Sequence, residues 1–439
     1  MRPDKGAGRR SRPASGPRRT VVTGIGVVAP GGGDREEFWR RIVNGKPAIR
    51  RITFFDPARF RSQVAAECDF VPAHYGLTPR EVRRTDRFVQ MAMAAADEAM
   101  ADSGLDPQAV DTERMGVSLG TATGAAGTLE DEYVVASDHG RHWVVDAEHV
   151  MPFLYQALVP SSGASELAVR YGAHGPAAVI STGCTAGIDA IGHAHRLIVD
   201  GEADVMVAGA SEAPVTPFSA AAFDAIRATT PHNDDPEGAS RPFDADRKGF
   251  VLGEGCAVLV LEELAHARAR GAEIYCEVTG YGSRANAFHM TGLRPDGLEL
   301  AEAIADAMRQ ARLDGADLGY ISAHGSGTKM NDRHETAAYK RALGHSAYQV
   351  PISSIKSVVG HSLGAIGSIE MAACALVIQR GVIPPTANLH TPDPDCDLDY
   401  TPVTAREARV DHALSAGSGF GGFQSAMIFS RLAGGRADS

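Results

Sequence analysis

One cysteine of this chain stands where a nucleophile is expected. Cys184 lies in the turn STGCTAG at 181–187, directly after the apolar run 177–180 and directly before a stretch that is typical of a buried helix. The sequence therefore places this thiol at a helix N-terminus, where the partial positive charge and the unpaired N–H groups favour the thiolate over the thiol. We predict a reactive nucleophile at this position.

The other five cysteines are typical of packing residues. Three of them lie in apolar runs and two beside acidic residues in predicted loops: Cys256, Cys276, Cys374, Cys68 and Cys396. Free cysteine is often buried as a small hydrophobic residue, and no C-x-x-C pair indicates zinc or redox chemistry. Only the cysteine of the 181–187 turn has small, polar residues on both sides.

Two histidines and a lysine follow predicted strands in the second half of the chain. His324, in AHGSGT at 323–328, comes at the carboxyl end of a strand, where open α/β sheets build their sites. Lys356 and His361 lie in SSIKSVVGHS at 353–362, just past a strand and entering a helix. A lone histidine is more often a surface residue or a satisfied core residue. Three such side chains in glycine-rich turns at strand ends indicate a shared site.

Composition limits the class of protein. With 439 residues, 44% of them hydrophobic, and 48 glycines, the chain can bury a large core, and its length allows two or three domains. A net charge of −11 argues against a nucleic-acid partner. The sparse, unpaired cysteines suit a reducing cytoplasm. No apolar run reaches 18 residues, so no transmembrane helix is predicted.

The two ends of the chain differ from the rest. Residues 1–19 are rich in arginine among glycine, proline and serine and lack the apolar core of a signal peptide. We predict a disordered basic extension over 1–19 and a flexible tail over 433–439.

The same arrangement is predicted twice along the chain. VTGIG at 22–26 returns as VTGYG at 278–282. After each copy come a helical region, a strand ending in small residues, a short strand entering a glycine-rich helix start, and an apolar strand. Alternating β and α segments favour parallel sheets with helices on both sides. We therefore predict two fused α/β halves, 20–270 and 271–432, that share one core.

Two short motifs favour other chemistries. GIGVVA at 24–29 fits the dinucleotide fingerprint G-x-G-x-x-A, but that motif must open a helix and PGGG follows at once. GHSLG at 360–364 fits the G-x-S-x-G nucleophile elbow, with Ser362 as the nucleophile of a serine acyltransferase. That fold needs an acid and then a histidine after the serine, and only His390 and His412 come later. A serine acyltransferase and a non-catalytic scaffold stay open as alternatives to a cysteine enzyme.

Five ordered motifs resemble the β-ketoacyl-acyl-carrier-protein synthases of the thiolase superfamily. They span about residues 20–432 and are STGCT, RPFDADR, AHGSGT, KSVVGH and GFGG, beginning at Ser181, Arg241, Ala323, Lys356 and Gly419. Further segments, among them VPSS at 159–162 and NDRHETAAYK at 331–340, are similar to the ketosynthase α subunit of bacterial type II polyketide synthases. VLGEG at 251–255 leans toward the fatty-acid enzymes. The resemblance implies thiolase-like duplicated α/β halves in a layered αβαβα core.

The resemblance also implies a decarboxylative Claisen condensation. Cys184 would carry the acyl chain, and the backbone N–H groups of Cys184 and Phe420 would hold the tetrahedral oxyanion. His324 and His361 would stabilise the enolate that forms when a malonyl thioester loses CO2.

Supporting and substrate-binding residues follow from the same resemblance. Lys356 would hydrogen-bond Glu335 and so orient the first histidine. Ser326, Thr328 and Thr291 would bind substrate, the first two at a phosphopantetheine arm. No metal or cofactor is implied.

The final glycine-rich turn and the nucleophile separate this chain from its neighbours in the superfamily. A thiolase proper would need a second cysteine in the turn SGFGG at 418–422, and the chain-length-factor subunits lack the nucleophilic cysteine. Cys184 therefore indicates a catalytic α subunit. The implied partners are a chain-length factor, as a heterodimer, and an acyl carrier protein, with no nucleic acid and no membrane. The alternative is a homodimer similar to β-ketoacyl-acyl-carrier-protein synthase II of fatty-acid biosynthesis.

Overall fold

The fold was obtained as a computed structural model, which describes residues 17–142 and 145–433. The basic extension expected at the N-terminus lies outside the described residues up to 16, as does the expected tail from 434 onward. The last two arginines of the expected N-terminal extension, Arg18 and Arg19, belong to the fold, contrary to expectation. Arg18 donates to the carbonyls of Ile198 and Ala203, and Arg19 pairs with Glu277.

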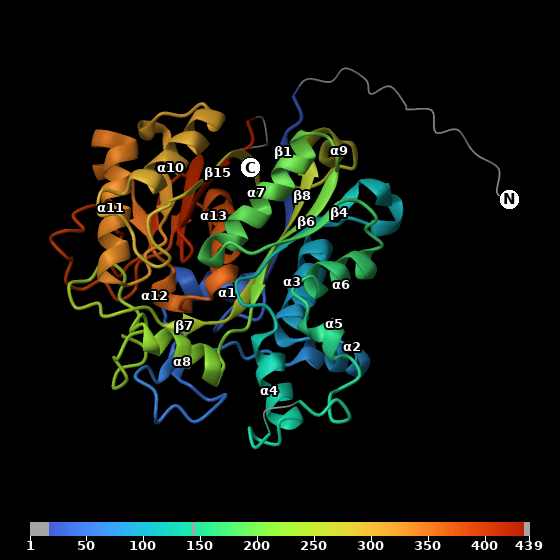
Figure 1. Cartoon of the computed structure of the whole chain (residues 1–439). Helices are drawn as coiled ribbons and strands as arrows, with labels where there is room; N and C mark the ends of the chain where they lie inside the picture. The colour runs from blue at the N-terminus through green and yellow to red at the C-terminus, as the bar shows by residue number, and fades with distance from the viewer. Residues whose placement is uncertain (1–16, 143–144, 434–439) are drawn as a thin grey trace, which may run out of the picture.

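One ten-stranded sheet runs through the molecule (Figure 1). Its strands are β1 (Thr20–Val28), β4 (Met115–Gly120), β5 (Ala177–Ile180), β6 (Val205–Glu212), β8 (Gly255–Glu263), β9 (Cys276–Ala285), β10 (Tyr320–Ser322), β11 (Ile352–Ser353), β14 (His412–Gly419) and β15 (Phe423–Ser430). Across the sheet they follow the order β11-β10-β14-β15-β9-β1-β8-β6-β4-β5.

The two halves of this sheet have the same topology. The order β5-β4-β6-β8-β1 in the first half corresponds to β11-β10-β14-β15-β9 in the second. In each half the first three strands are parallel, and the last two are antiparallel to their neighbours. The halves join where Thr20–Val22 of β1 pairs with Cys276–Val278 of β9. The predicted duplication is confirmed.

The expectation of parallel sheets is wrong, because each half is mixed. β14 and β15 are separated only by residues 420–422, and so short a connection can join only antiparallel strands. At this turn Gly419 of β14 is paired with Phe423 of β15.

Helices cover the sheet in layers. On one outer face lie α3 (Arg87–Ser103) and α6 (Ser162–Tyr171), and on the other α10 (Leu298–Ala311) and α11 (Lys329–Leu343) (Figure 1). Between the halves α7 (Ala186–Val199) packs on α13 (Ile366–Arg380), in the largest of the buried clusters. The two halves of the sheet are the two β layers between these three layers of helices, so the arrangement is the predicted αβαβα core.

The two middle helices approach each other through glycine. A Cβ on Gly187 would lie 2.3 Å from the backbone nitrogen of Ser368, and one on Gly367 would lie 2.9 Å from that of Ile188. Only glycine permits this approach. Because both contacts are at the helix N-termini, they bring the turn before α7 next to the turn before α13.

The stretch Leu363–Arg380 is long and apolar enough to cross a membrane by length and composition, although Glu370 interrupts its apolar run. It contains α13, and 89% of it is buried inside the protein. A helix that is apolar on all sides must be covered, and here the two halves of the molecule cover it.

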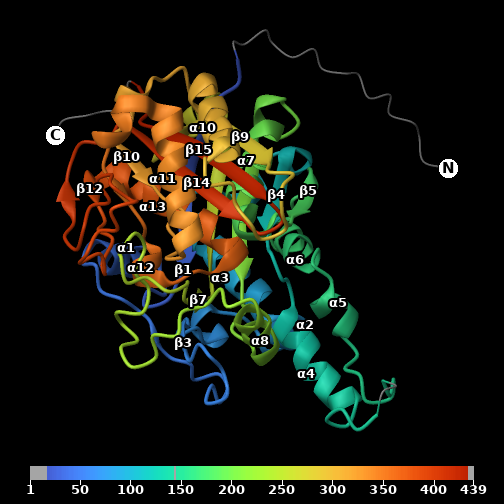
Figure 2. The same cartoon turned by 60° about the vertical axis from the view of Figure 1, so that its left-hand side comes forward.

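The remaining elements lie around this core. The helices are α1 (Arg35–Val43), α2 (Pro79–Arg84), α4 (Ala126–Ala136), α5 (Leu154–Leu158), α8 (Pro217–Ala225), α9 (Leu264–Ala269) and α12 (Lys356–Val359). The short strands are β2 (Arg50–Arg51), β3 (Val64–Ala66), β7 (Leu252–Gly253), β12 (Val382–Ile383) and β13 (Arg406–Glu407). In Figure 2, α4 and α5 extend away from the body of the molecule.

Candidate active site

The predicted nucleophile lies between β5 and α7. Cys184 is the central residue of a 3-10 turn, Gly183–Thr185, which leads directly into α7. Gly183 has a φ of +61°, and a Cβ there would lie 2.8 Å from the carbonyl oxygen of Phe420. Glycine is therefore required for both the backbone conformation and the approach of the second half.

The thiol is buried, and its protonation differs from the expectation. Burial raises the pKa of Cys184 to about 11, although the backbone N–H of Phe420 and the charge of Lys356 act in the opposite direction. The predicted thiolate is wrong for the resting protein, because the cost of desolvating the charge exceeds the stabilisation by these two groups. The sulfur must lose its proton during attack.

Two backbone N–H groups from different halves meet at this sulfur. The Phe420 N–H acts on the Cys184 sulfur from the second half and lowers the pKa of the thiol. A Cβ on Gly419 would lie 3.1 Å from the backbone nitrogen of Cys184, so the turn after β14 packs directly on the nucleophile turn. The N–H groups of residues 184 and 420 are thus placed as an oxyanion hole.

The two predicted histidines lie side by side. Their ring centroids are 5.2 Å apart and the ring planes cross at 82°. Nδ1 of His361 accepts the N–H of Leu363 at 3.2 Å, which leaves the proton of the neutral ring on Nε2 as a donor. Burial, together with the charge of Lys356, lowers the pKa of His324 and His361 well below the ordinary value. Both rings are neutral at neutral pH.

The predicted hydrogen bond between Lys356 and Glu335 is wrong. The Lys356 ammonium donates to the carbonyl oxygen of His324 and forms an ion pair with Glu370 of α13. Glu335 instead accepts the backbone N–H groups of His324 and Gly325, at 2.5 Å and 2.7 Å. Lys356 and Glu335 therefore both hold the backbone of His324, the first through its carbonyl oxygen and the second through its N–H.

Sequence reasoning missed Glu370. The signal was present, because this is the only charged residue between Ile366 and Ile378, and a buried charge requires a partner. Burial raises the pKa of Glu370 and of Glu335 to about 7, against the lowering effect of Lys356.

A narrow cavity of about 70 Å³ connects these groups. Seven of the nine predicted site residues line it: Cys184, Thr291, His324, Ser326, Thr328, His361 and Phe420. The other two predicted residues, Lys356 and Glu335, are fully buried behind it. The rest of the lining consists of residues that the sequence did not identify as site residues, most of them apolar: Phe223, Phe250, Leu293, Met330, Asn331, Leu363, Ser418 and Gly419.

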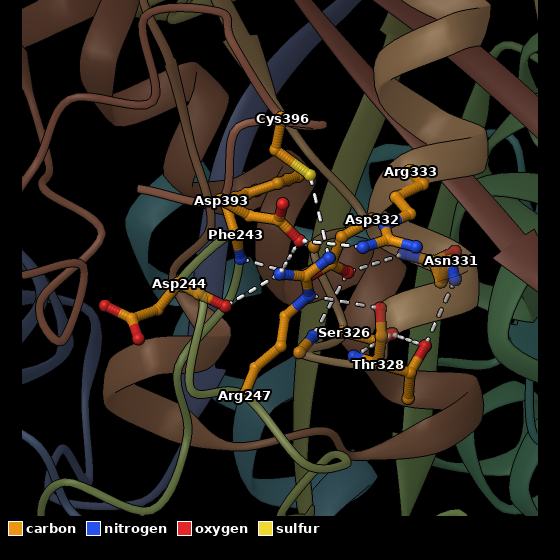
Figure 3. A network of polar contacts seen from close by, with 12 residues as sticks. Phe243, Asp244, Arg247, Ser326, Thr328, Asn331, Asp332, Arg333, Asp393 and Cys396 are labelled. Atoms are coloured by element: carbon orange, nitrogen blue, oxygen red, sulfur yellow. Dashed lines mark hydrogen bonds and ion pairs between the residues drawn. The ribbon is translucent and has the colours of Figure 1, made fainter. Parts of the chain in front are cut away.

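The RPFDADR segment supports the loop that carries Ser326 and Thr328. Figure 3 shows Arg247, fully buried, between Asp332 at 3.0 Å and Asp393 at 2.7 Å. Asp332 also accepts the N–H of Gly327, and Arg247 donates to the carbonyl of Thr328. A buried arginine paired with two carboxylates makes this loop rigid.

The two competing motifs have structural explanations. GIGVVA lies inside β1 and opens no helix, and Cβ atoms on Gly24 and Gly26 would lie about 2 Å from carbonyl oxygens of α3. The hydroxyl of Ser362 has no hydrogen-bond partner in the described part of the chain, while His412 contacts Ser430. Among the described residues, no group of three or more His, Cys, Asp or Glu is placed to hold a metal ion.

Comparison with known proteins agrees with this geometry. Residues 18–267 match the N-terminal domain family of β-ketoacyl synthases, and residues 275–390 match the C-terminal domain family. The chain is 58% identical over 414 residues to the tetracenomycin polyketide synthase ketoacyl synthase alpha subunit of Streptomyces glaucescens, covering 94% of this chain and 97% of that protein.

Two solved structures are similar over nearly the whole chain. A type II polyketide synthase acyl carrier protein in complex with its ketosynthase bound to the hexaketide gives a TM-score of 0.89 at 40% identity, covering 95% of this chain and all of that one (100%). The ishigamide ketosynthase/chain length factor gives 0.87 at 33% identity, with coverages of 95% and 100%. The chain therefore belongs to the β-ketoacyl synthase family and, within it, to the ketosynthase α subunits of type II polyketide synthases.

Proposed function

We propose that this chain extends an acyl chain held on Cys184 by decarboxylative condensation with a malonyl thioester of an acyl carrier protein. The observation that carries the proposal is the single buried cavity that holds a thiol, two backbone N–H donors and two neutral imidazoles. These groups match the two charges that develop in the reaction, one on each carbonyl oxygen.

The first step transfers the chain to the enzyme. The Cys184 sulfur attacks the carrier-protein thioester, and the N–H groups of Cys184 and Phe420 stabilise the tetrahedral oxyanion. The intermediate collapses to the acyl-enzyme and releases the phosphopantetheine thiolate. This leaving thiolate takes up the proton that the cysteine thiol loses.

The second step forms the carbon–carbon bond. As the malonyl thioester loses CO2, negative charge develops on its thioester oxygen, and the neutral rings of His324 and His361 donate N–H groups to it. The enolate carbon attacks the acyl carbonyl on Cys184, whose oxygen again occupies the oxyanion hole. Collapse expels the cysteine thiolate, which takes up a proton from solvent, and leaves the lengthened β-ketoacyl chain on the carrier protein.

A cationic hollow beside the cavity supports a carrier protein as the substrate donor. This hollow, of about 530 Å³, shares Thr291, Thr328 and Phe420 with the catalytic cavity. Besides Arg247, which is buried and paired with Asp332 and Asp393, four cationic residues line it: Arg61, Arg227, Lys248 and Lys329. A phosphopantetheine arm carries a phosphate at the end away from its thiol, and these cations would attract it while the arm passes between the two spaces.

An exposed edge and an apolar face support a chain-length-factor partner. β5 is the last strand of the sheet and is paired on one side only. Elsewhere, α4 and α5, which Figure 2 shows extending from the body, and the residue before α5 expose large apolar side chains: Leu129, Tyr133, Val134, Val135, Phe153 and Tyr155. Exposed apolar surface of this extent is typical of a subunit interface.

The six cysteines are all free, in agreement with the cytoplasm as location.

The experiment that tests the proposal replaces Cys184 by glutamine. Cys184→Gln should abolish condensation, because no acyl-enzyme can form. It should still convert malonyl-carrier protein to acetyl-carrier protein, since the histidines remain and the glutamine oxygen can occupy the oxyanion hole. Mass spectrometry of the carrier protein measures both activities. A folded variant with neither activity would contradict the proposed division of roles.

A further inference from the structure

A carboxylate that the proposed mechanism does not use lies one helical turn after the nucleophile. Asp189 is in the first turn of α7 and is only 5% exposed. Within the described part of the chain its hydrogen bonds come from four hydroxyl groups, those of Thr182, Thr185, Tyr281 and Ser425. The two oxygens of a carboxylate offer about four acceptor sites, so they can serve all four donors at once.

One oxygen of this carboxylate holds the nucleophile turn. Oδ2 of Asp189 accepts from the hydroxyl of Thr182 and, at 2.8 Å, from that of Thr185. These two threonines stand on either side of Gly183 and Cys184 in the chain. The turn that presents the sulfur is therefore bound at both ends to a single atom.

The other oxygen holds the second half of the molecule. Oδ1 accepts from the hydroxyl of Tyr281 on β9 at 2.8 Å and from that of Ser425 on β15 at 2.5 Å. β15 begins at Phe423, directly after the turn that contains Phe420, and Ser425 is paired in the sheet with both β9 and β14. A displacement of this oxygen would thus be transmitted to the Phe420 turn.

We infer that Asp189 is a positioning residue that sets the spacing between the two N–H groups of the oxyanion hole. These groups belong to Cys184 in the first half and Phe420 in the second, and Asp189 joins the two halves at this place with one oxygen on each. The inference rests on the proposed function. Oxyanion donors act only within about 2.7–3.1 Å of the developing charge, and a misplacement of about 1 Å in an active site can cost about 100-fold in rate.

The role differs from that of a general structural carboxylate, because it concerns only one of the two half-reactions. Acylation of Cys184 uses the oxyanion hole, whereas decarboxylation uses the two histidines. These are held from other elements: Lys356 and Glu335 bind the backbone of His324, and the N–H of Leu363 binds Nδ1 of His361. Loss of Asp189 should therefore slow acylation and leave decarboxylation nearly unchanged.

The experiment compares Asp189→Ala with the unchanged enzyme, using the full chain purified together with its partner subunit. Single-turnover acylation of the cysteine by an acyl-carrier protein, followed by mass spectrometry, should fall about 100-fold, with the KM for the carrier protein within about 3-fold. Malonyl decarboxylation, measured in a Cys184→Ala background with and without Asp189→Ala, should differ by less than about 3-fold. Asp189→Asn, which keeps the volume and one acceptor oxygen, should lose about 10-fold in acylation.

A second pair of variants keeps the test decisive if the alanine variant does not fold. Tyr281→Phe combined with Ser425→Ala removes only the donors from the second half and should slow acylation about 10-fold. Glu262→Gln is the matched control, because Glu262 is also a fully buried carboxylate and accepts from Thr23, His266 and Arg270. It should lower stability without separating the two half-reactions.

The possible results separate the inference from the proposed function. Equal losses in both half-reactions, or no loss in acylation, would overturn the positioning role of Asp189. An unchanged enzyme that performs neither half-reaction would instead overturn the proposed function.

Discussion

The nucleophile turn of the first half and the corresponding turn of the second half have the same place in the fold, but the first holds a neutral group and the second holds charged groups. In one, β5 leads through Gly183–Thr185 into α7; in the other, β11 leads through α12 and a 3-10 turn, Leu363–Ala365, into α13. The first presents a neutral thiol, and the second buries the ion pair Lys356–Glu370. Duplication thus supplied two equivalent positions, one now used for covalent chemistry and the other for fixing hydrogen-bond donors.

The strongest test of this comparison removes the donors of the second half. His324→Ala and His361→Ala should each slow malonyl decarboxylation by about 10²–10³, the usual effect of losing one donor to a developing oxyanion. Acylation of Cys184 should be less affected, because it depends on the backbone N–H groups. The measurement is the rate of acetyl-carrier protein formation by mass spectrometry. Normal decarboxylation in either variant would show that the histidines do not have this role.

The ion pair can be tested through stability. Lys356→Met leaves Glu370 buried without its partner, which should lower the free energy of unfolding by about 3–5 kcal/mol at pH 8. Burial places the pKa of Glu370 at about 7, above its unfolded value, so protonation favours the folded state below that pH and the loss should be smaller at pH 5.5.

Chemical denaturation at the two pH values provides the measurement. The double variant Lys356→Met/Glu370→Gln is the control and should be more stable than the single variant at pH 8. An equal loss at both pH values would contradict the buried pair.

The protonation of the nucleophile gives a third prediction. Burial raises the pKa of Cys184 to about 11. As long as the pH stays below that value, each increase of one pH unit should raise the thiolate fraction about tenfold. The rate of alkylation by iodoacetamide should therefore rise roughly 100-fold between pH 7 and pH 9. Peptide mapping, with Cys184→Ala as the control, assigns the label. A rate that is already constant at pH 7 would indicate a resting thiolate.

The smallest effect is expected at the serine of the nucleophile-elbow motif. Ser362→Ala should leave acylation and condensation within about 3-fold, because this hydroxyl contacts neither of the later histidines. Condensation assays with acyl-carrier and malonyl-carrier protein provide the measurement. A loss of acyl transfer with Cys184 intact would restore the serine acyltransferase alternative.

Residues in local motifs could be predicted from the sequence. Cys184, His324 and His361 each stand at the end of a strand in a glycine-containing turn, and both signals are local. The duplication was also visible, because the order of elements repeats. The mixed direction of the strands was not found, although the short connection at 420–422 indicates it.

Properties that depend on distant packing could not be predicted. The pKa of Cys184 depends on burial by both halves, and the choice of Glu370 rather than Glu335 as the partner of Lys356 depends on how α13 crosses the site. In the sequence, Asp189 has the position of an ordinary acidic residue in the first turn of a helix. Only the approach of β9 and β15 in the folded protein gives it a second set of hydrogen-bond partners.

The position of β1 in the sheet has a consequence for synthesis on the ribosome. This first strand lies between β8 and β9, so residues 29–254 must be made before either neighbour exists. At about 5–20 residues per second, this strand waits roughly 10–45 s for both of the strands that pair with it. Such a wait exposes a nascent chain to aggregation, and we expect production of this protein to depend on chaperones and on slow translation more than its final stability suggests.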